Sequence, residues 1–325
     1  MTSVVVTFRV ESEHRETLTA ALGHVPRVVF LSDVSPQDRA KELAKADVLI
    51  SWSVERELRP EEFKLLEHAK LLQLVSAGVD HLPFRDLPLG PMIASNAGAY
   101  AEPMAEHAVA MILAIMKNLV DREVKLRNGV FDQTNVNRML EGSNCAILGF
   151  GGIGKKIAGL LRCFDVKIYA LNTTGRTDEP VVFVGTLKDL EHVLRLADIV
   201  IITLPLTNST RKLIGKEQLG WMKNDAVLVN VARADIIDEA GLYMKLKANP
   251  QFTAAIDTWW IEPLRHGRFS TNYPFLELPN VLGSPHNSGI VHNSFEKGTM
   301  HAVENVKRFL NHEPVLGAVN RQDYL

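Results

Sequence analysis

Residues 145–164 read CAILGFGGIGKKIAGLLRCF. An apolar run typical of a buried strand leads into a G-x-G-x-x-G pattern, and a segment typical of a helix follows. Glycines let the chain turn tightly and leave no Cβ in the path of an approaching pyrophosphate, which the free N–H groups of the helix N-terminus can bind. We therefore expect a dinucleotide at Gly149, Gly151, Gly152, Ile153 and Gly154; the alternative is a glycine-rich turn that binds nothing.

Short β-rich runs alternate with helical segments on both sides of this turn. Strands are expected at 4–8, 28–31, 48–50, 71–75, 144–150, 166–171, 198–204, 226–231, 253–256 and 281–284. Helices are expected at 36–45, 60–68, 101–119, 153–164, 187–196 and 294–310. Apolar strands separated by helices indicate parallel sheets covered on both faces. The predicted fold class is α/β, with two doubly wound parallel-sheet, Rossmann-like domains and a cleft between them.

Composition excludes several classes of function. The chain has 325 residues, which suits about two domains, and its net charge of −2 gives no pull towards nucleic acid or an anionic membrane. No uncharged stretch is long enough to span a bilayer, and the N-terminal apolar run is too short for a signal peptide, so a cytoplasmic location is expected. Cys145 and Cys163 form no CxxC pair and are expected to be core thiols, and no metal site is expected.

The end of the strand at 166–171 distinguishes between two forms of the cofactor. An Asp or Glu about 20 residues after the glycine turn would bind the ribose diol of NAD, but Asn172 stands there, followed by Thr173, Thr174 and Arg176. These groups can donate hydrogen bonds to a 2′-phosphate, which a carboxylate would repel. NADP is therefore favoured and NAD stays possible, including use of both; the alternative for Arg176 is a solvated loop position.

Further motifs surround the glycine turn in a fixed order. They are NAGAY (96–100), MAEH (104–107), LPLT (204–207), STR (209–211), VNVAR (229–233), DTWWIEP (257–263) and SPH (284–286). In these motifs the chain resembles the D-isomer-specific 2-hydroxyacid dehydrogenases, and in particular the short glyoxylate or hydroxypyruvate reductase type. Ala234 stands where this family commonly has glycine, and the double tryptophan at 259–260 also departs from the pattern.

The resemblance implies a catalytic triad of Arg233, Glu262 and His286. Reduction of a ketone needs a proton on oxygen, and His286 is the expected general acid and, in reverse, base. Glu262 would hold the other ring nitrogen, and Arg233 would bind the substrate carboxylate and polarise the carbonyl. The alternatives are a structural histidine, a strand-capping arginine and a loop carboxylate. The family pattern adds cofactor contacts at Leu204, Pro205, Thr210, Val231, Ala232, Arg233, Asp257 and His286.

The first domain is expected to complete the substrate site. Ser76, Ala77, Gly78 and Val79 resemble the family's carboxylate-binding loop, joining Arg233 and His286 as substrate contacts; the alternative is an ordinary strand-ending turn. Candidates to line the side-chain pocket are Trp52, Tyr100, Trp259 and Trp260, although aromatic residues more often belong to the core.

The same resemblance implies a discontinuous architecture. The substrate domain is expected at 1–97 plus 290–325, and the dinucleotide-binding Rossmann domain at 98–289. The apolar helix at 101–119 is expected to pack in a homodimer. Glu262 argues against a formate dehydrogenase, which would have Gln there, and the chain length argues against a long phosphoglycerate dehydrogenase with C-terminal regulatory domains.

Three functions follow, of which the first is the best supported and the other two are unranked alternatives to it. The first is an NAD(P)-dependent D-2-hydroxyacid dehydrogenase that acts on a small 2-keto or 2-hydroxy acid. The second is a phosphite dehydrogenase-like activity. The third is a catalytically weak, dinucleotide-sensing binding protein or corepressor, which would need the glycine turn but not the triad.

Overall fold

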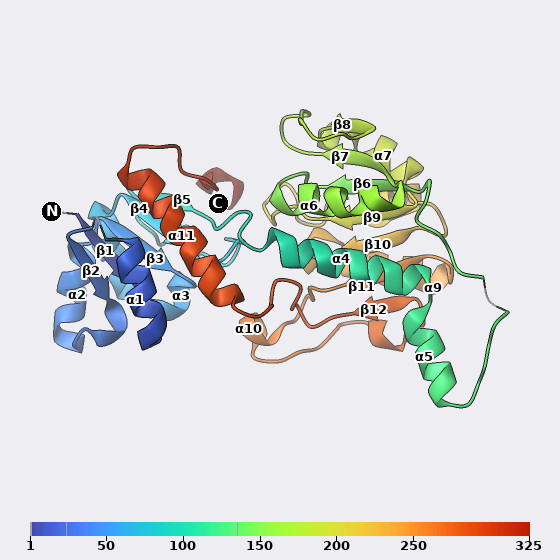
Figure 1. Ribbon diagram of the computed structural model, residues 1–325, viewed down its shortest axis with the longest axis horizontal. Helices are drawn as coiled ribbons and strands as arrows, with labels where there is room; N and C mark the ends of the chain where they lie inside the picture. The colour runs from blue at the N-terminus through green and yellow to red at the C-terminus, as the bar shows by residue number, and fades with distance from the viewer. Residues whose placement is uncertain (1, 24, 135) are drawn as a thin grey trace. The chain divides into compact units, whose positions relative to one another are not determined.

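The computed structural model describes residues 2–23, 25–134 and 136–325. The chain divides into two compact units. Unit 1 comprises Met1–Tyr100 and Val291–Leu325, and unit 2 comprises Ala101–Ile290. Each unit has its own sheet (Figure 1), and buried apolar clusters pack in each unit.

Unit 1 is built on a five-stranded parallel sheet in the order β2-β1-β3-β4-β5. Its strands are β1 Ser3–Val6, β2 Arg27–Phe30, β3 Val48–Ser51, β4 Leu71–Leu74 and β5 Met92–Ala94. The helices are α1 Ser12–Ala21, α2 Pro36–Ala44, α3 Val54–Glu57 and α11 Ser294–Leu310, with 3₁₀ turns η1 Leu31–Asp33, η2 Pro60–His68 and η7 Arg321–Asp323. Val4 and Val6 face one apolar cluster and Val5 the other, so side chains on both faces of the sheet are buried.

Unit 2 is built on a seven-stranded parallel sheet in the order β12-β11-β10-β9-β6-β7-β8. Its strands are β6 Asn144–Leu148, β7 Lys167–Leu171, β8 Phe183–Gly185, β9 Ile199–Ile202, β10 Val227–Asn230, β11 Thr253–Ile256 and β12 Val281–Gly283. The helices are α4 Ala101–Met116, α5 Leu119–Arg127, α6 Gly152–Leu161, α7 Leu190–Leu196, α8 Lys216–Trp221, α9 Glu239–Ala248 and α10 Pro263–His266. Shorter 3₁₀ turns are η3 Arg162–Phe164, η4 Leu187–Asp189, η5 Ala234–Ile236 and η6 Phe275–Glu277.

Apolar clusters cover both faces of this second sheet. Along β6, Cys145 and Ile147 belong to the cluster that α4 and α6 cover, whereas Ala146 and Leu148 belong to the cluster that α7, α8 and α9 cover. Alternate residues of a strand point to opposite faces, and a fully apolar strand therefore needs a helix layer on each side. The predicted α/β class with two parallel, Rossmann-like sheets is confirmed.

Several local expectations differ from the structure. β5 and β8, which have three residues each, were not expected. The segment 60–68 is a 3₁₀ helix. Cys163 is exposed, so the expectation of two core thiols is wrong for it: the residue lies in η3, beyond Leu161, the last buried residue of α6. Cys145 is fully buried in β6, and burial raises the pKa of its thiol.

Within the described ranges, no single helix is both long and apolar enough to cross a membrane. The pair α4 and α5 reaches the required length and composition only when taken together, and these two helices are bent by 59°.

The buried ring of Phe252, the residue before β11, tests how strongly the core of unit 2 stabilises the fold. The ring is 0% exposed. We expect Phe252→Ala to lower the free energy of unfolding by about 3–5 kcal/mol, because the substitution removes apolar contacts and leaves a cavity. Leu89→Ala, at an 81% exposed position, is the control and should shift it by about 0.5 kcal/mol or less in urea unfolding. Similar losses for the two variants would contradict the assignment of the core.

Candidate functional site

The site residues expected in unit 2 follow the carboxyl ends of neighbouring parallel strands. The glycine turn follows β6, the Asn172 loop follows β7 and the Leu204 loop follows β9. Arg233, Glu262 and His286 come after β10, β11 and β12. Parallel strands end at the same edge of a sheet, so the fold brings these loops together. The edge includes β6, where the chain first adds β7 on one side and then crosses to β9 on the other, which makes it a topological switch point.

Glycine is required at two points of the turn after β6. Gly149 has φ +102°, and a Cβ there would lie 2.7 Å from the backbone of Thr203 and Leu204. A Cβ at Gly154 would lie 2.6 Å from the carbonyl oxygen of Gly149. A Cβ at Gly151, by contrast, would have no atom within 4 Å, and this residue starts α6 without a side-chain cap. The open space and the uncapped helix N-terminus at Gly152 and Ile153 fit a pyrophosphate group.

The side chain of Asn172 holds the loop after β7 together by hydrogen bonds. Its side-chain oxygen accepts the N–H groups of Thr174 and Gly175 at 3.0 and 2.7 Å, and its amide nitrogen donates to the Arg176 carbonyl at 2.8 Å. Thr173 and Arg176 are exposed. Within the described part of the chain, the guanidinium of Arg176 has no hydrogen-bond or ion-pair partner. The loop is therefore held from within, while Arg176 and Thr173 are free to contact a ligand.

The loop after β9 is closed by Thr210, which is 4% exposed. Its hydroxyl donates to the Pro205 carbonyl at 2.7 Å and accepts the N–H of Thr207 at 2.8 Å. Thr203 donates its hydroxyl to the Gly149 carbonyl at 2.6 Å, which links this loop to the glycine turn. Leu204 is half-buried and Pro205 is exposed at the edge of the sheet.

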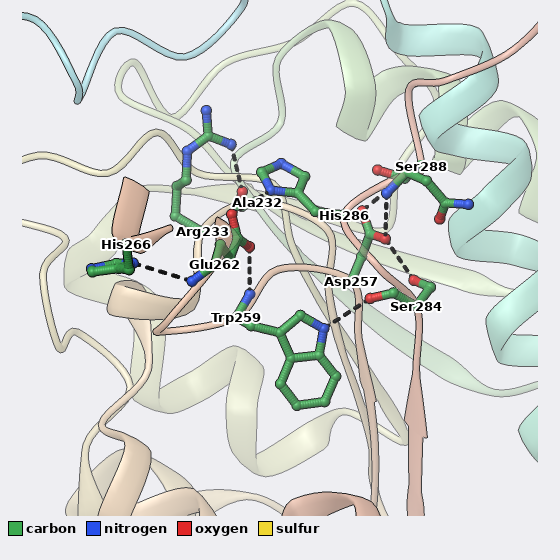
Figure 2. Close-up of polar contacts among 10 residues, drawn as sticks. Ala232, Arg233, Asp257, Trp259, Glu262, His266, Ser284, His286 and Ser288 are labelled. Carbon is green, nitrogen blue, oxygen red and sulfur yellow. Dashed lines mark hydrogen bonds and ion pairs between the residues drawn. The ribbon is translucent and has the colours of Figure 1, made fainter. Parts of the chain in front are cut away.

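The backbone around Arg233 is fixed by Asn230, the last residue of β10. Asn230 accepts the Ala232 N–H and donates to the Arg233 carbonyl, each at 3.0 Å. Arg233 itself donates to the Ala232 carbonyl at 2.8 Å (Figure 2). Val231 and Ala232 are buried beneath the arginine. The arginine therefore leaves the sheet edge from a rigid base.

Glu262 and His286 form the central pair of the site (Figure 2). Glu262 Oε2 lies 2.8 Å from His286 Nδ1, and its Oε1 accepts the Trp259 N–H at 2.7 Å. Burial alone would raise the pKa of Glu262, but the bonds from His286 and Trp259 and the positive charges of His286 and Arg233 hold the pKa below its usual range. The carboxylate is thus ionised at neutral pH and fixes the ring of His286.

Asp257 holds the turn that presents His286. The carboxylate is 0% exposed and accepts the Ser284 hydroxyl at 2.5 Å and the N–H groups of Asn287 and Ser288 at 3.1 and 3.3 Å. Its backbone carbonyl accepts the His286 N–H at 2.8 Å. His286 has φ +51°, a left-handed conformation that a histidine rarely adopts without support. The position predicted to contact the cofactor therefore also supports the turn that carries His286.

The two tryptophans pack in or against the core of unit 2. The Trp259 indole N–H donates to the Ser284 carbonyl at 2.8 Å, and the ring is 7% exposed. Trp260 donates to the Ile237 carbonyl and stacks on Phe275 at 5.3 Å. Both rings belong to the core of unit 2 or pack against it, which is the alternative that the sequence left open.

In unit 1, the loop from Ser76 to Val79 follows β4 as expected. Asn96 ties its first residue down: the Asn96 N–H donates to the Ser76 carbonyl at 3.0 Å and its amide to the Val75 carbonyl at 2.9 Å. The Tyr100 hydroxyl also donates to the Val75 carbonyl, and burial raises the pKa of Tyr100 to about 12. Over the described chain, the N–H groups of Ala77 and Gly78 have no acceptor.

The aromatic candidates of unit 1 pack on one another. Trp52 lies 5.3 Å from Phe295 and 6.5 Å from Tyr100 between ring centroids. They form an apolar cluster within this unit.

Three residues that hold the site together were not given a role from the sequence. Asn230, Ser284 and His107 were visible only as members of motifs. His107 Nε2 lies 3.0 Å from the Ser284 hydroxyl, a contact between α4 and the end of β12. Nothing in local composition indicates such a pairing, because the two residues are far apart in the sequence. For a metal ion, the described residues offer no group of three or more His, Cys, Asp or Glu ligands.

Comparison with known proteins gives a family match. The model of the D-isomer specific 2-hydroxyacid dehydrogenase, NAD binding domain, matches residues 109–288, more than half of the chain, and this confirms the resemblance seen in the motifs. The D-3-phosphoglycerate dehydrogenase of Methanocaldococcus jannaschii is 26% identical over 92% of this chain, which spans only 56% of that relative. The glyoxylate reductase of Aeropyrum pernix is 30% identical, over 79% of each chain.

Solved structures agree with this match. A structure from Pyrobaculum aerophilum, provisionally named a formate dehydrogenase, has a TM-score of 0.82 and 27% identity, with 99% of each chain covered. The similarity therefore extends over both units.

Two glycines of the turn, Gly149 and Gly151, give a matched test of its geometry. We expect Gly149→Ala to lower the melting temperature, because it puts a Cβ against the backbone of Leu204 and strains a residue at φ +102°, at a cost of about 1–3 kcal/mol. Gly151→Ala, which has open space, should melt like the wild type in circular dichroism. If Gly151→Ala were the less stable variant, this geometry would be wrong.

Proposed function

Because the chain belongs to the D-isomer-specific 2-hydroxyacid dehydrogenase family, we propose that it is an NAD(P)-dependent oxidoreductase that interconverts a small 2-keto acid and its D-2-hydroxy acid by hydride transfer. The observation that carries the proposal is the Glu262–His286 pair, 2.8 Å apart, on the sheet edge that also holds the glycine turn and Arg233. A dinucleotide-binding protein without catalysis would not need this pair.

His286 is the proposed general acid in reduction and the base in oxidation. The ionised Glu262 can only accept a hydrogen bond, so Nδ1 of His286 carries a proton and Nε2 is left to exchange a proton with the substrate oxygen. The nearby carboxylate also stabilises the imidazolium form that reduction requires. A bound reduced nicotinamide would supply the hydride.

Arg233 is the proposed anchor for the substrate carboxylate and the group that polarises the carbonyl. Its planar fork can bind a carboxylate through two parallel bonds, and the Asn230 contacts fix the backbone from which it extends. We assign the free N–H groups of the Ser76–Val79 loop to the same carboxylate. That the substrate lies between the two domains, 1–97 with 290–325 and 98–289, stays a prediction.

The proposed cofactor is NADP, with NAD as the alternative. Gly151, Gly152 and Ile153 would hold the pyrophosphate, and Arg176, with Thr173 and Thr174, the 2′-phosphate. Asn172 supports this role indirectly, because its side chain shapes the loop that carries Arg176. The remaining proposed cofactor contacts are Gly149, Gly154, Leu204, Pro205, Thr210, Val231, Ala232, Arg233, Asp257 and His286.

Glyoxylate and hydroxypyruvate are the first substrates to test, since relatives carry the names glyoxylate reductase and hydroxypyruvate reductase. Glu262 continues to argue against formate as the substrate. A cytoplasmic location accords with this activity and stays a prediction.

A homodimer is proposed as well, through α5 and the segment after it rather than through α4. The apolar residues of α4 are largely buried within unit 2, whereas α5 has no buried residue. Phe131 is 77% exposed, and acidic and basic residues are mixed along α5, so its charge offers little attraction for a strongly charged partner. We call α5 and the segment after it the arm. Its exposed apolar side chains are Leu119, Val120, Val124, Leu126, Val130, Phe131, Val136 and Met139.

The activity is tested by following NADPH oxidation with glyoxylate, hydroxypyruvate, pyruvate and phenylpyruvate. We expect turnover with at least one, and a fall in kcat of about 10²–10⁴-fold in His286→Ala because the proton donor is lost. NADPH binding, followed by fluorescence, should be retained. His68→Leu, at an exposed position, is the control. Near-normal rates in His286→Ala would contradict the assigned role. If the wild type bound NADPH tightly but oxidised it with none of the four keto acids, a sensor or phosphite oxidation would be favoured.

Cofactor choice is tested at Arg176. We expect Arg176→Ala to weaken NADPH binding by roughly tenfold or more, because a charge-assisted bond to the 2′-phosphate is lost, and to leave NADH binding unchanged. Dissociation constants measured by fluorescence titration give both numbers. Equal losses for the two cofactors would rule out a phosphate contact.

The arm is tested by sedimentation equilibrium. We expect the wild type to have twice the 36.1 kDa mass of the chain, and the double variant Leu126→Ser/Phe131→Ser to dissociate because apolar contact is lost. A wild-type monomer would contradict the proposal.

A further inference from the structure

We propose that His107 of α4 is a positioning residue for His286, acting through Ser284 and Asp257 by donating a hydrogen bond from Nε2. This inference rests on the proposed function, because it explains how the general acid is held. No contact between His107 and the substrate or cofactor is needed.

The direction of the bonds follows from the buried carboxylate. Asp257 is 0% exposed, and its Oδ1 and Oδ2 accept the N–H groups of Asn287 and Ser288. Ser284 therefore donates its single hydroxyl proton to Asp257 Oδ1, over 2.5 Å. The Ser284 oxygen is then left as an acceptor towards His107 Nε2, 3.0 Å away, so that nitrogen must carry a proton. His107 Nε2 also lies 3.7 Å from Asp257 Oδ1, where its N–H has a favourable electrostatic contact.

The hydrogen bond from His107 to Ser284 affects His286 through the turn that Asp257 holds. The Asp257 carboxylate accepts the N–H groups of Asn287 and Ser288, and its backbone accepts that of His286. His286 at φ +51° depends on these three bonds. If His107 no longer fixes the Ser284 hydroxyl, the carboxylate can rotate and the turn loosens. The effect should fall on proton transfer, because the Arg233 backbone is held separately by Asn230.

The kinetic test compares two substitutions. Gln can place its amide nitrogen near the position of the histidine Nε2, whereas Leu has similar bulk and no donor. We expect His107→Leu to lower kcat for the keto acid by about tenfold, with the substrate KM unchanged, and His107→Gln to restore kcat to about the wild-type value. Equal rates in all three proteins would overturn the inference, and equal losses in both variants would overturn the donor role.

A second measurement does not depend on turnover. In ¹H–¹⁵N spectra of protein labelled at histidine, the His107 signals are identified by their loss in His107→Gln. We expect Nε2 to be protonated; an unprotonated Nε2 would overturn the inference even where His107→Leu fails to fold. If the wild type reduced none of the keto acids, the proposed function would fail, while the spectra would still decide the state of His107.

Discussion

The parallel pairing of the seven strands of unit 2 is the constraint on which the site depends. Parallel strands need helical crossovers, and these return the chain so that the carboxyl ends of the strands all lie at one edge. Six loops from segments distant in the sequence therefore meet there. The helices that make the crossovers also bury both faces of the sheet, which makes the edge a rigid base for the loops.

Rigidity at this edge comes from buried polar side chains as much as from the strands. Asn230, Asp257 and Thr210 are each almost fully buried, and each satisfies backbone groups of a loop that carries an expected functional residue. A buried polar group is costly when unpaired, so each of these side chains favours one loop conformation over its alternatives. The need to pair these buried polar groups therefore also fixes the backbone at Arg233 and His286.

The sequence predicted those features that have local causes. The glycine turn was predictable because Gly149 and Gly154 have no room for a Cβ, and the β11 boundaries were predictable because an apolar run ends at a buried aspartate. The short strands β5 and β8 were missed, although β12, which is equally short, was expected from the run at 281–284. Nothing in the sequence indicated that the Asn172 side chain would bond within its own loop.

The contacts that the sequence could not predict are long-range ones. His107 and Ser284 meet because α4 packs beside the sheet, and Glu262 meets His286 because β11 and β12 are neighbours. Only the motif order, through the resemblance to a family, suggested that the second pair belongs together. The exposure of the arm around Phe131 likewise depends on where α5 ends up in the fold and not on its composition.

Isotope transfer tests the hydride step, with NADPH that carries deuterium at both C4 positions of the nicotinamide so that either face of the ring delivers the label. With glyoxylate and hydroxypyruvate as substrates, mass spectrometry of the product is expected to find one deuterium at C2 of the 2-hydroxy acid. The chiral product from hydroxypyruvate should be the D isomer. Tight NADPH binding without deuterium in the product of any 2-keto acid would contradict the claim that this sheet edge is a hydride-transfer site.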